Sequence, residues 1–94
     1  MNKRLMFIPR LTEFTDDSTG EVVKGGRIAL ADVEARDDNS GIGYYCELLW
    51  VNETILNSLK NNPKAKELPQ EVEVVLENRG IKQRPRLVDV KYIN

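Results

Sequence analysis

The sequence predicts a mainly β single domain, residues 1–94, of five strands with one short helix between the third and the fourth strand. The stretch Gly43–Val51 is mostly aromatic, β-branched or leucine, which is typical of a buried strand. Directly after it, Glu53–Lys60 changes the apolar period from two residues to about 3.6, which indicates a helix. Gln70–Glu77 alternates apolar and acidic residues, the pattern of a half-buried strand. A chain of 94 residues is long enough for one modest core.

The first expected strand is Lys3–Phe14 (KRLMFIPRLTEF). Pro9 cannot donate a ladder hydrogen bond, so it marks an edge, a bulge or a bend, and a strongly curved first strand of a small barrel accommodates it. Thr15–Gly26 is rich in Asp, Ser, Thr and Gly and predicts a long hairpin loop, in which the pair Gly25-Gly26 supplies backbone freedom. Glu21–Lys24 is an alternative start for the second strand.

The second expected strand is Arg27–Ala35, because Ile28 and Leu30 alternate with smaller residues. Its alanine content makes a helix the alternative. Arg36–Gly43 contains Asp, Asn, Ser and Gly and predicts a turn. Four residues of one parity in the third strand are expected to face the core: Tyr44, Cys46, Leu48 and Trp50.

The expected helix begins after Asn52, whose side chain is suited to cap its free N–H groups. Val51 is placed to pack against Leu56 one turn into the helix, and Pro63 prevents the helix from continuing. Three residues form its apolar face: Ile55, Leu56 and Leu59.

The last two strands form the expected C-terminal hairpin. In Gln70–Glu77, three residues are expected to point inward: Val72, Val74 and Leu76. A turn begins at Asn78, and Arg86–Ile93 is the final strand, with one side made of Val88, Val90 and Tyr92.

Five strands with a helix between the third and the fourth is the order of the OB-fold, a Greek-key barrel, and we expect the helix to close one end of it. Small α+β sheets and SH3-like barrels with a late helix are alternatives. Ligands of OB-folds lie across the second and third strands, between two loops that correspond here to Thr15–Gly26 and Asn78–Pro85.

The net charge of −1 conceals an uneven distribution. Residues 1–12 and 78–94 are basic, whereas residues 13–77 hold fourteen acidic residues against six basic ones. The loop after Asn78 carries four cations without an acid, which suits a phosphate backbone: Arg79, Lys82, Arg84 and Arg86. The alternative is a solvated hairpin tip whose arginines pair with the acidic side of Gln70–Glu77.

Single-stranded nucleic acid also needs aromatic rings on which bases stack. Tyr45 shares its parity with Glu47 and is therefore the expected outward ring. Lys24 and Arg27 flank the two glycines and are expected to extend a positive groove.

We expect no enzymatic activity, cofactor or small-molecule substrate. The chain has no histidine, and its single cysteine, Cys46, resembles a core thiol without a base nearby in sequence. Asp16-Asp17 and Asp37-Asp38 lack metal-site spacing and suit turns, so no metal is expected. Without a signal sequence or an apolar run of about 20 residues, the chain is expected to be cytoplasmic and not membrane-bound.

The chain resembles the small OB-fold single-stranded-DNA-binding proteins of filamentous phages, plasmids and conjugative elements. The resemblance lies in a basic first strand and three segments: TGEVVKGGR, GYYCELLWV and RPRLVDVKYIN. It implies non-sequence-specific binding of single strands in DNA replication or transfer, cooperative along the strand and often by a dimer. The alternative function is a small β-barrel adaptor that binds another protein.

Overall fold

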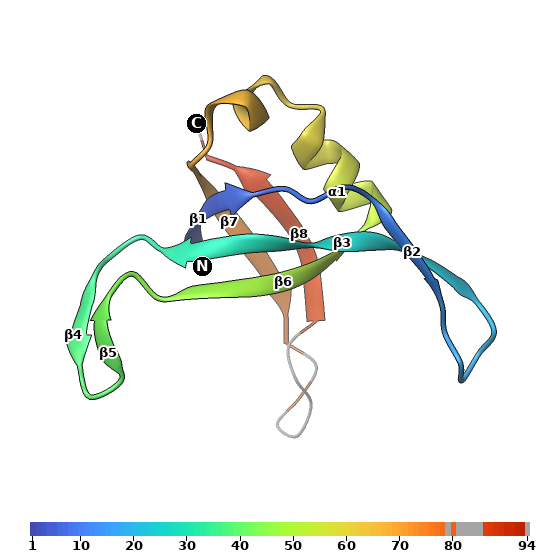
Figure 1. Cartoon of the computed structure of the whole chain (residues 1–94), viewed down its shortest axis with the longest axis horizontal. Helices are drawn as coiled ribbons and strands as arrows, with labels where there is room; N and C mark the ends of the chain where they lie inside the picture. The colour runs from blue at the N-terminus through green and yellow to red at the C-terminus, as the bar shows by residue number, and fades with distance from the viewer. Residues whose placement is uncertain (79, 81–85, 94) are drawn as a thin grey trace.

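The computed structural model describes residues 1–78, 80 and 86–93. It is mainly β, with an antiparallel six-stranded sheet, a separate two-stranded hairpin and one short α-helix (Figure 1). The elements in chain order are β1 (Asn2–Phe7), β2 (Thr12–Thr15), β3 (Val22–Asp32), β4 (Arg36–Asp38), β5 (Gly41–Gly43), β6 (Cys46–Asn52), α1 (Glu53–Lys60), a 3-10 helix η1 (Pro63–Glu67), β7 (Gln70–Glu77) and β8 (Arg86–Tyr92). In the described part of the chain, no helix is long and apolar enough to cross a membrane.

The long strand β3 organises the sheet, because β6 pairs along one of its edges and β1 and β2 share the other. Phe7 lies opposite Ala29 and Thr12 lies opposite Gly25, so residues 8–11 face only residues 26–28. This break in the strand contains Pro9 and divides the expected first strand into β1 and β2, while the register of β1 against β3 shifts between Leu5 and Phe7. The expected break at Pro9 is confirmed, and so is a strand in place of the alternative helix at Arg27–Ala35, although this strand runs from Val22 to Asp32.

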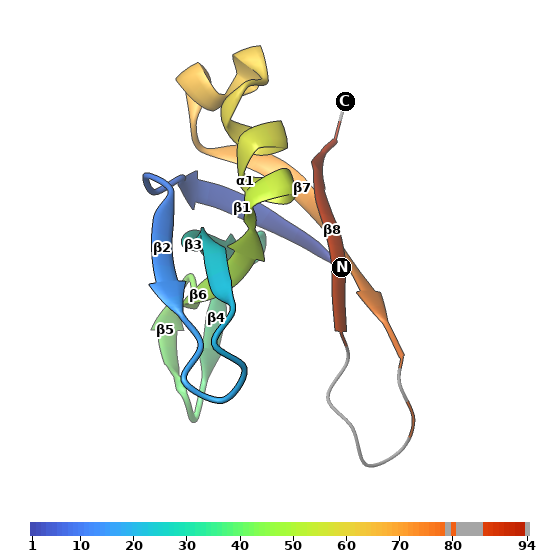
Figure 2. The same ribbon diagram turned by 90° about the vertical axis from the view of Figure 1, so that its right-hand side faces the viewer.

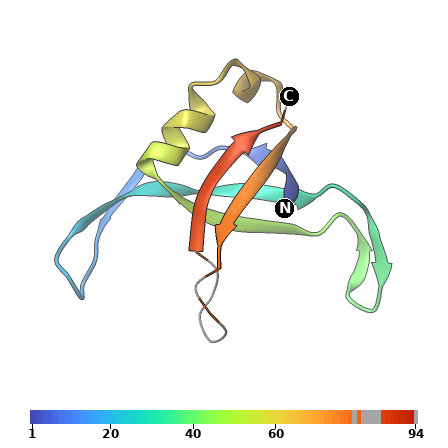
Figure 3. The ribbon, with the colours of Figure 1, turned by 180° about the vertical axis from the view of Figure 1, so that it is seen from behind.

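The sheet continues from β1 to β7 and β8 and curls, so that the β7–β8 hairpin lies across from β3 and β6 (Figure 2). Seen from behind, this hairpin crosses in front of β3 and β6 (Figure 3). Among the described residues β6 pairs only with β3, and β8 only with β7, so the closed barrel that we expected is not found. Closure requires the tilt and stagger of all strands to match, and the apolar pattern of one strand does not encode either.

The core lies inside this curl and beneath α1, which packs against β3, β6 and β8. The helix has the expected bounds, and the Asn52 side chain accepts a hydrogen bond of 2.9 Å from the Ile55 N–H as its cap. The buried apolar residues are Leu5, Ile28, Leu30, Val51, Ile55, Leu56, Leu59, Val72, Val74 and Val90. At the other end of the helix, the Tyr92 hydroxyl donates 2.8 Å to the Leu59 carbonyl.

Several local expectations were wrong. Arg36–Gly43 is not a simple turn but the β4–β5 hairpin. This hairpin and the β2–β3 hairpin lie at opposite ends of β3 (Figure 1). Leu76 and Val88 are exposed, because a register shift in the β7–β8 pair interrupts their alternation. The pair Gly25-Gly26 lies buried inside β3, not in a flexible loop.

Candidate nucleic-acid interface

One side of the sheet carries aromatic and cationic residues where a small protein usually exposes polar ones. Residues directly opposite each other in neighbouring strands point to the same side. Arg27 lies opposite Trp50, and Ala29 lies opposite both Leu48 and Phe7. By the same register Arg4 pairs with Ala31, and Phe14 pairs with Val23, which has the parity of Arg27. We call this side the aromatic face, and it consists of Arg4, Phe7, Phe14, Arg27, Leu48 and Trp50.

Its large side chains are open to solvent. The exposed fraction is 59% for Phe7, 50% for Phe14 and 65% for Leu48, whereas Trp50 is partly buried. No acidic residue of β3 or β6 points to this side, because Asp32 and Glu47 have the opposite parity. The β1–β7 register places Glu71 beside Arg4, so the first acidic side chains occur on β7. The aromatic face is therefore an apolar and cationic area bordered by an acidic strand.

The orientation of β6 is the reverse of the predicted one. Val51 is buried and Leu49 packs against the core, so Trp50, Leu48 and Cys46 point to the other side, and Cys46 is exposed. The physical reason is the helix, since a residue that packs under α1 one position before its N-cap must point inward. The expected contact of Val51 with Leu56 requires Trp50 to point outward, so it is a local signal in the sequence for the observed orientation.

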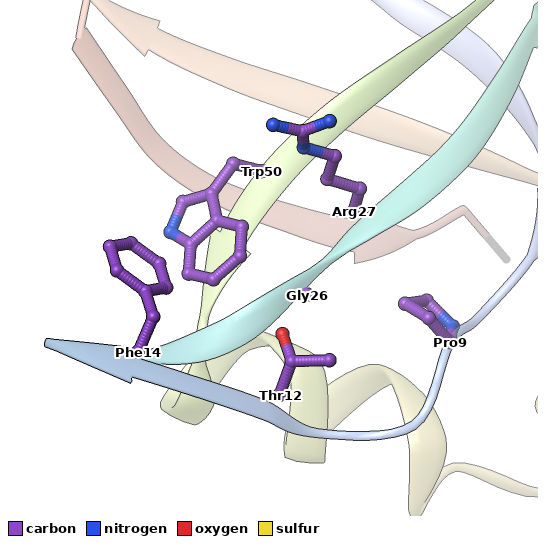
Figure 4. Close-up of a pocket in the computed structure, with 6 residues that line it drawn as sticks. All are labelled: Pro9, Thr12, Phe14, Gly26, Arg27 and Trp50. Carbon is purple, nitrogen blue, oxygen red and sulfur yellow. The ribbon is translucent and has the colours of Figure 1, made fainter.

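A shallow cavity of about 590 Å³ lies at the β2 end of the aromatic face. Its lining residues are Pro9, Thr12, Phe14, Gly26, Arg27 and Trp50. Phe14 and Trp50 stand at one side of the cavity and Pro9 at the other, with Gly26 and Thr12 between them (Figure 4). The two rings meet edge to face, with centroids 5.4 Å apart and planes at 68°.

The glycine pair allows this packing. A Cβ on Gly25 would lie 2.1 Å from the Val51 carbonyl oxygen and 2.9 Å from Cζ2 of Trp50. A Cβ on Gly26 would lie 2.8 Å from Cγ of Pro9. Both glycines are thus needed for close approach of neighbouring chain segments, and the indole of Trp50 rests against bare backbone.

Two arginines hold tyrosines near the ends of the same strands. The guanidinium carbon of Arg4 lies 5.8 Å from the ring centroid of Tyr44, and that of Arg36 lies 5.0 Å from Tyr45. Both tyrosines precede β6 and both are exposed, at 55% and 53%. The expectation that Tyr44 lies in the core was therefore wrong, while the outward position of Tyr45 is confirmed.

An ion-pair cluster on the opposite side of the sheet anchors this arrangement. Asp32 accepts 2.5 Å from Lys3 Nζ and 2.9 Å from Arg36 Nε, and Lys3 Nζ also lies 3.7 Å from Glu47. The hydrogen bond from Lys3 lowers the pKa of Asp32; partial burial opposes this effect, and the charges of Lys3 and Arg36 add to it. The same hydrogen bond raises the pKa of Lys3. Arg36 thus connects the cluster to Tyr45.

The structure brings only some of the predicted site residues together. Arg27 is exposed on the aromatic face. Lys24, which lies opposite Glu13, is three positions before Arg27 in the same strand and therefore points to the other side of the sheet. Arg86 is exposed at the start of β8, opposite Glu77. The other three predicted cations lie outside the described residues: Arg79, Lys82 and Arg84.

The aromatic face adds five residues that sequence reasoning did not select: Arg4, Phe7, Phe14, Leu48 and Trp50. Within the described residues, no three Cys, Asp or Glu side chains gather as they would around a metal ion. In comparisons with protein-family models, curated proteins and solved structures, nothing matches this chain.

Proposed function

We propose that this chain binds single-stranded DNA without sequence specificity, in the replication or transfer of a phage or mobile element. The aromatic face carries the proposal, because exposed rings alternate there with arginines. Phe14 and Trp50 offer rings to bases, while Arg4 and Arg27 offer positive charge to phosphates. Tyr44, against Arg4 of the aromatic face, extends the same chemistry along the sheet. Tyr45 lies against Arg36, which pairs with Asp32 on the opposite side, and is a separate candidate ring.

We also propose that the fold is an open relative of the OB-fold barrel. Counting β1 and β2 as one bulged strand, the neighbours along the sheet are β6, β3, β1/β2, β7 and β8. In this arrangement β3 and β6 are the second and third strands, across which OB-fold ligands lie. The aromatic face covers these two strands, so the ligand position expected from the fold and the chemistry of the surface agree.

A protein ligand is the second candidate function. β6 pairs only with β3 in the described part of the chain, so the outer edge of this strand presents unpaired backbone groups. Such an edge accepts an added strand from another chain. An adaptor of this kind has no need of arginines on the aromatic face, and this difference separates the two functions.

The test is a fluorescence-anisotropy titration of labelled oligo-dT with the whole chain at several salt concentrations. Each neutralised phosphate contributes about −0.7 to the slope of log K against log salt on a single strand, so three or four contacts give about −2 to −3. Replacing Arg27 with alanine should reduce the steepness by about 0.7. Lys66→Ala, an exposed cation in η1, is the matched control and should leave the slope unchanged.

A parent protein that does not bind oligo-dT at low salt would exclude the nucleic-acid function and favour the adaptor. Oligo-rU in the same assay tests the preference for DNA over RNA. Sedimentation velocity of the free protein tests the homodimer that the resemblance implies.

A further inference from the structure

The cavity beside Trp50 is built to hold a flat ring. The planes of Phe14 and Trp50 meet at 68° with their centroids 5.4 Å apart, so the two rings touch edge to face and are not stacked in parallel. The indole is positioned before any ligand arrives, because it lies against the backbone at Gly25 and against the ring of Phe14. A ring that enters the cavity therefore finds aromatic surface that is already in place.

The cavity has few polar side chains, and only one of them is charged. The Thr12 hydroxyl donates 2.9 Å to the Gly25 carbonyl, so its proton is engaged within the sheet. Arg27 is the single charged side chain among the lining residues, and none of them is a carboxylate or an amide. The cavity thus suits an uncharged flat ring that carries a neighbouring anion, and it disfavours a cationic ligand.

We infer that this cavity is a receptor for one unpaired base of a nucleic-acid strand, held by its ring face and not read by its hydrogen-bonding edge. The base packs against Trp50 and Phe14, and Arg27 meets a phosphate next to it. Paired bases in a duplex have both faces covered by their neighbours, so the receptor accepts only single strands. This inference rests on the proposed function and names the group that the site binds.

The test compares an eight-nucleotide oligo-dT with an oligomer of the same length whose bases are all absent. Because Trp50 is the sole tryptophan, its fluorescence reports on the cavity alone. We expect oligo-dT to quench this emission. It should also bind about 5- to 150-fold more tightly than the abasic oligomer, which is the range for the loss of a single stacked base. Oligo-dA and oligo-dC should bind within a few-fold of oligo-dT.

The variant is Phe14→Ala, with Phe14→Leu as a milder second change at the same position. Phe14→Ala should weaken oligo-dT binding about fivefold or more and leave the salt slope and abasic binding unchanged. Val88→Ala is the matched control, because Val88 is equally exposed, at 50%, but lies on β8 away from the cavity. Circular dichroism shows whether each variant is folded.

Equal binding of oligo-dT and the abasic oligomer would overturn the inference and leave the proposed function standing. An equal effect of Phe14→Ala and Val88→Ala would also overturn it. If oligo-dT does not bind at all, the proposed function fails. The base receptor is then tested by titrating the protein with thymidine monophosphate while the indole N–H resonance of Trp50 is observed. A shift with this nucleotide but not with deoxyribose 5-phosphate supports the receptor, and no shift rejects it.

Discussion

The rings of Phe14 and Trp50 meet edge to face at 5.4 Å, although the two residues lie on different strands, β2 and β6, with β3 between them. Such a contact is worth about 0.5–1.5 kcal/mol beyond the area that it buries. A double-mutant cycle with Phe14→Ala and Trp50→Ala should therefore give a coupling free energy of about 0.5–1.5 kcal/mol in urea unfolding. Additive single effects would show that the two rings do not contact each other in solution.

The orientation of β6 is tested by two leucines on paired strands. Leu48 is 65% exposed, whereas Leu30 is 1% exposed. Leu48→Ala should change the free energy of unfolding by less than about 0.5 kcal/mol, and Leu30→Ala should lower it by about 2–5 kcal/mol. A large decrease in the free energy of unfolding for Leu48→Ala would show that β6 has the opposite orientation, with Trp50 in the core.

Gly25 should tolerate no side chain. A Cβ at this position meets the Val51 carbonyl oxygen at 2.1 Å, so Gly25→Ala should cost about 3 kcal/mol and shift the emission maximum of Trp50. Gly20→Ala is the control, because Gly20 has space for a Cβ but a φ of +75°. It should cost about 1–2 kcal/mol and leave the emission of Trp50 unchanged. Equal costs would contradict the close approach at Gly25.

The cluster around Asp32 predicts a pH dependence at both ends of the scale. The pKa of Asp32 is lowered by folding, so its contribution to stability is full above the unfolded value of about 4 and is lost as the pH falls below it. The pKa of Lys3 is raised, so its contribution is full below about pH 10.4 and is lost as the pH rises further.

Urea midpoints at pH 5 and at a pH near 2 measure the acid side of this dependence. Asp32→Asn should lower stability at pH 5 and reduce the further loss on acidification. Asp17→Asn, at an exposed turn carboxylate, should leave the acid dependence close to that of the parent. An unchanged acid dependence in Asp32→Asn would show that the pair with Lys3 does not contribute.

The cationic residues that follow Asn78 in the sequence offer a separate test of phosphate contacts. If Arg84 and Arg86 each contact a phosphate, replacing both with alanine should reduce the steepness of the salt dependence by about 1.4. Thermal stability should remain nearly unchanged, because Arg86 is exposed. Tyr45→Ala should instead weaken binding with the slope intact, since stacking releases no counterion. If the double variant binds as the parent protein does, Arg84 and Arg86 do not contact phosphates, and any phosphate contacts come from other cationic residues.

Several elements could be predicted from the sequence because their signals are local. The cap at Asn52, the apolar face of α1 and the break at Pro9 each depend on residues that are close together in the sequence. The alternation in β7 identified Val72 and Val74 as core residues for the same reason. Each of these features follows from a period, a capping group or a missing donor that nearby residues already contain.

The tertiary structure alone decided which residues form the cavity, and it decided the side of β6 that faces the core, for which the contact of Val51 with Leu56 was the one local signal. Gly43–Val51 has apolar residues at both parities, so the strand itself does not specify its inner side; the packing of Val51 and Leu49 under α1 does. The cavity joins Pro9 and Phe14 to Trp50, more than thirty positions later. That meeting requires β3 to pair with β2 along one edge and with β6 along the other, which no local pattern encodes.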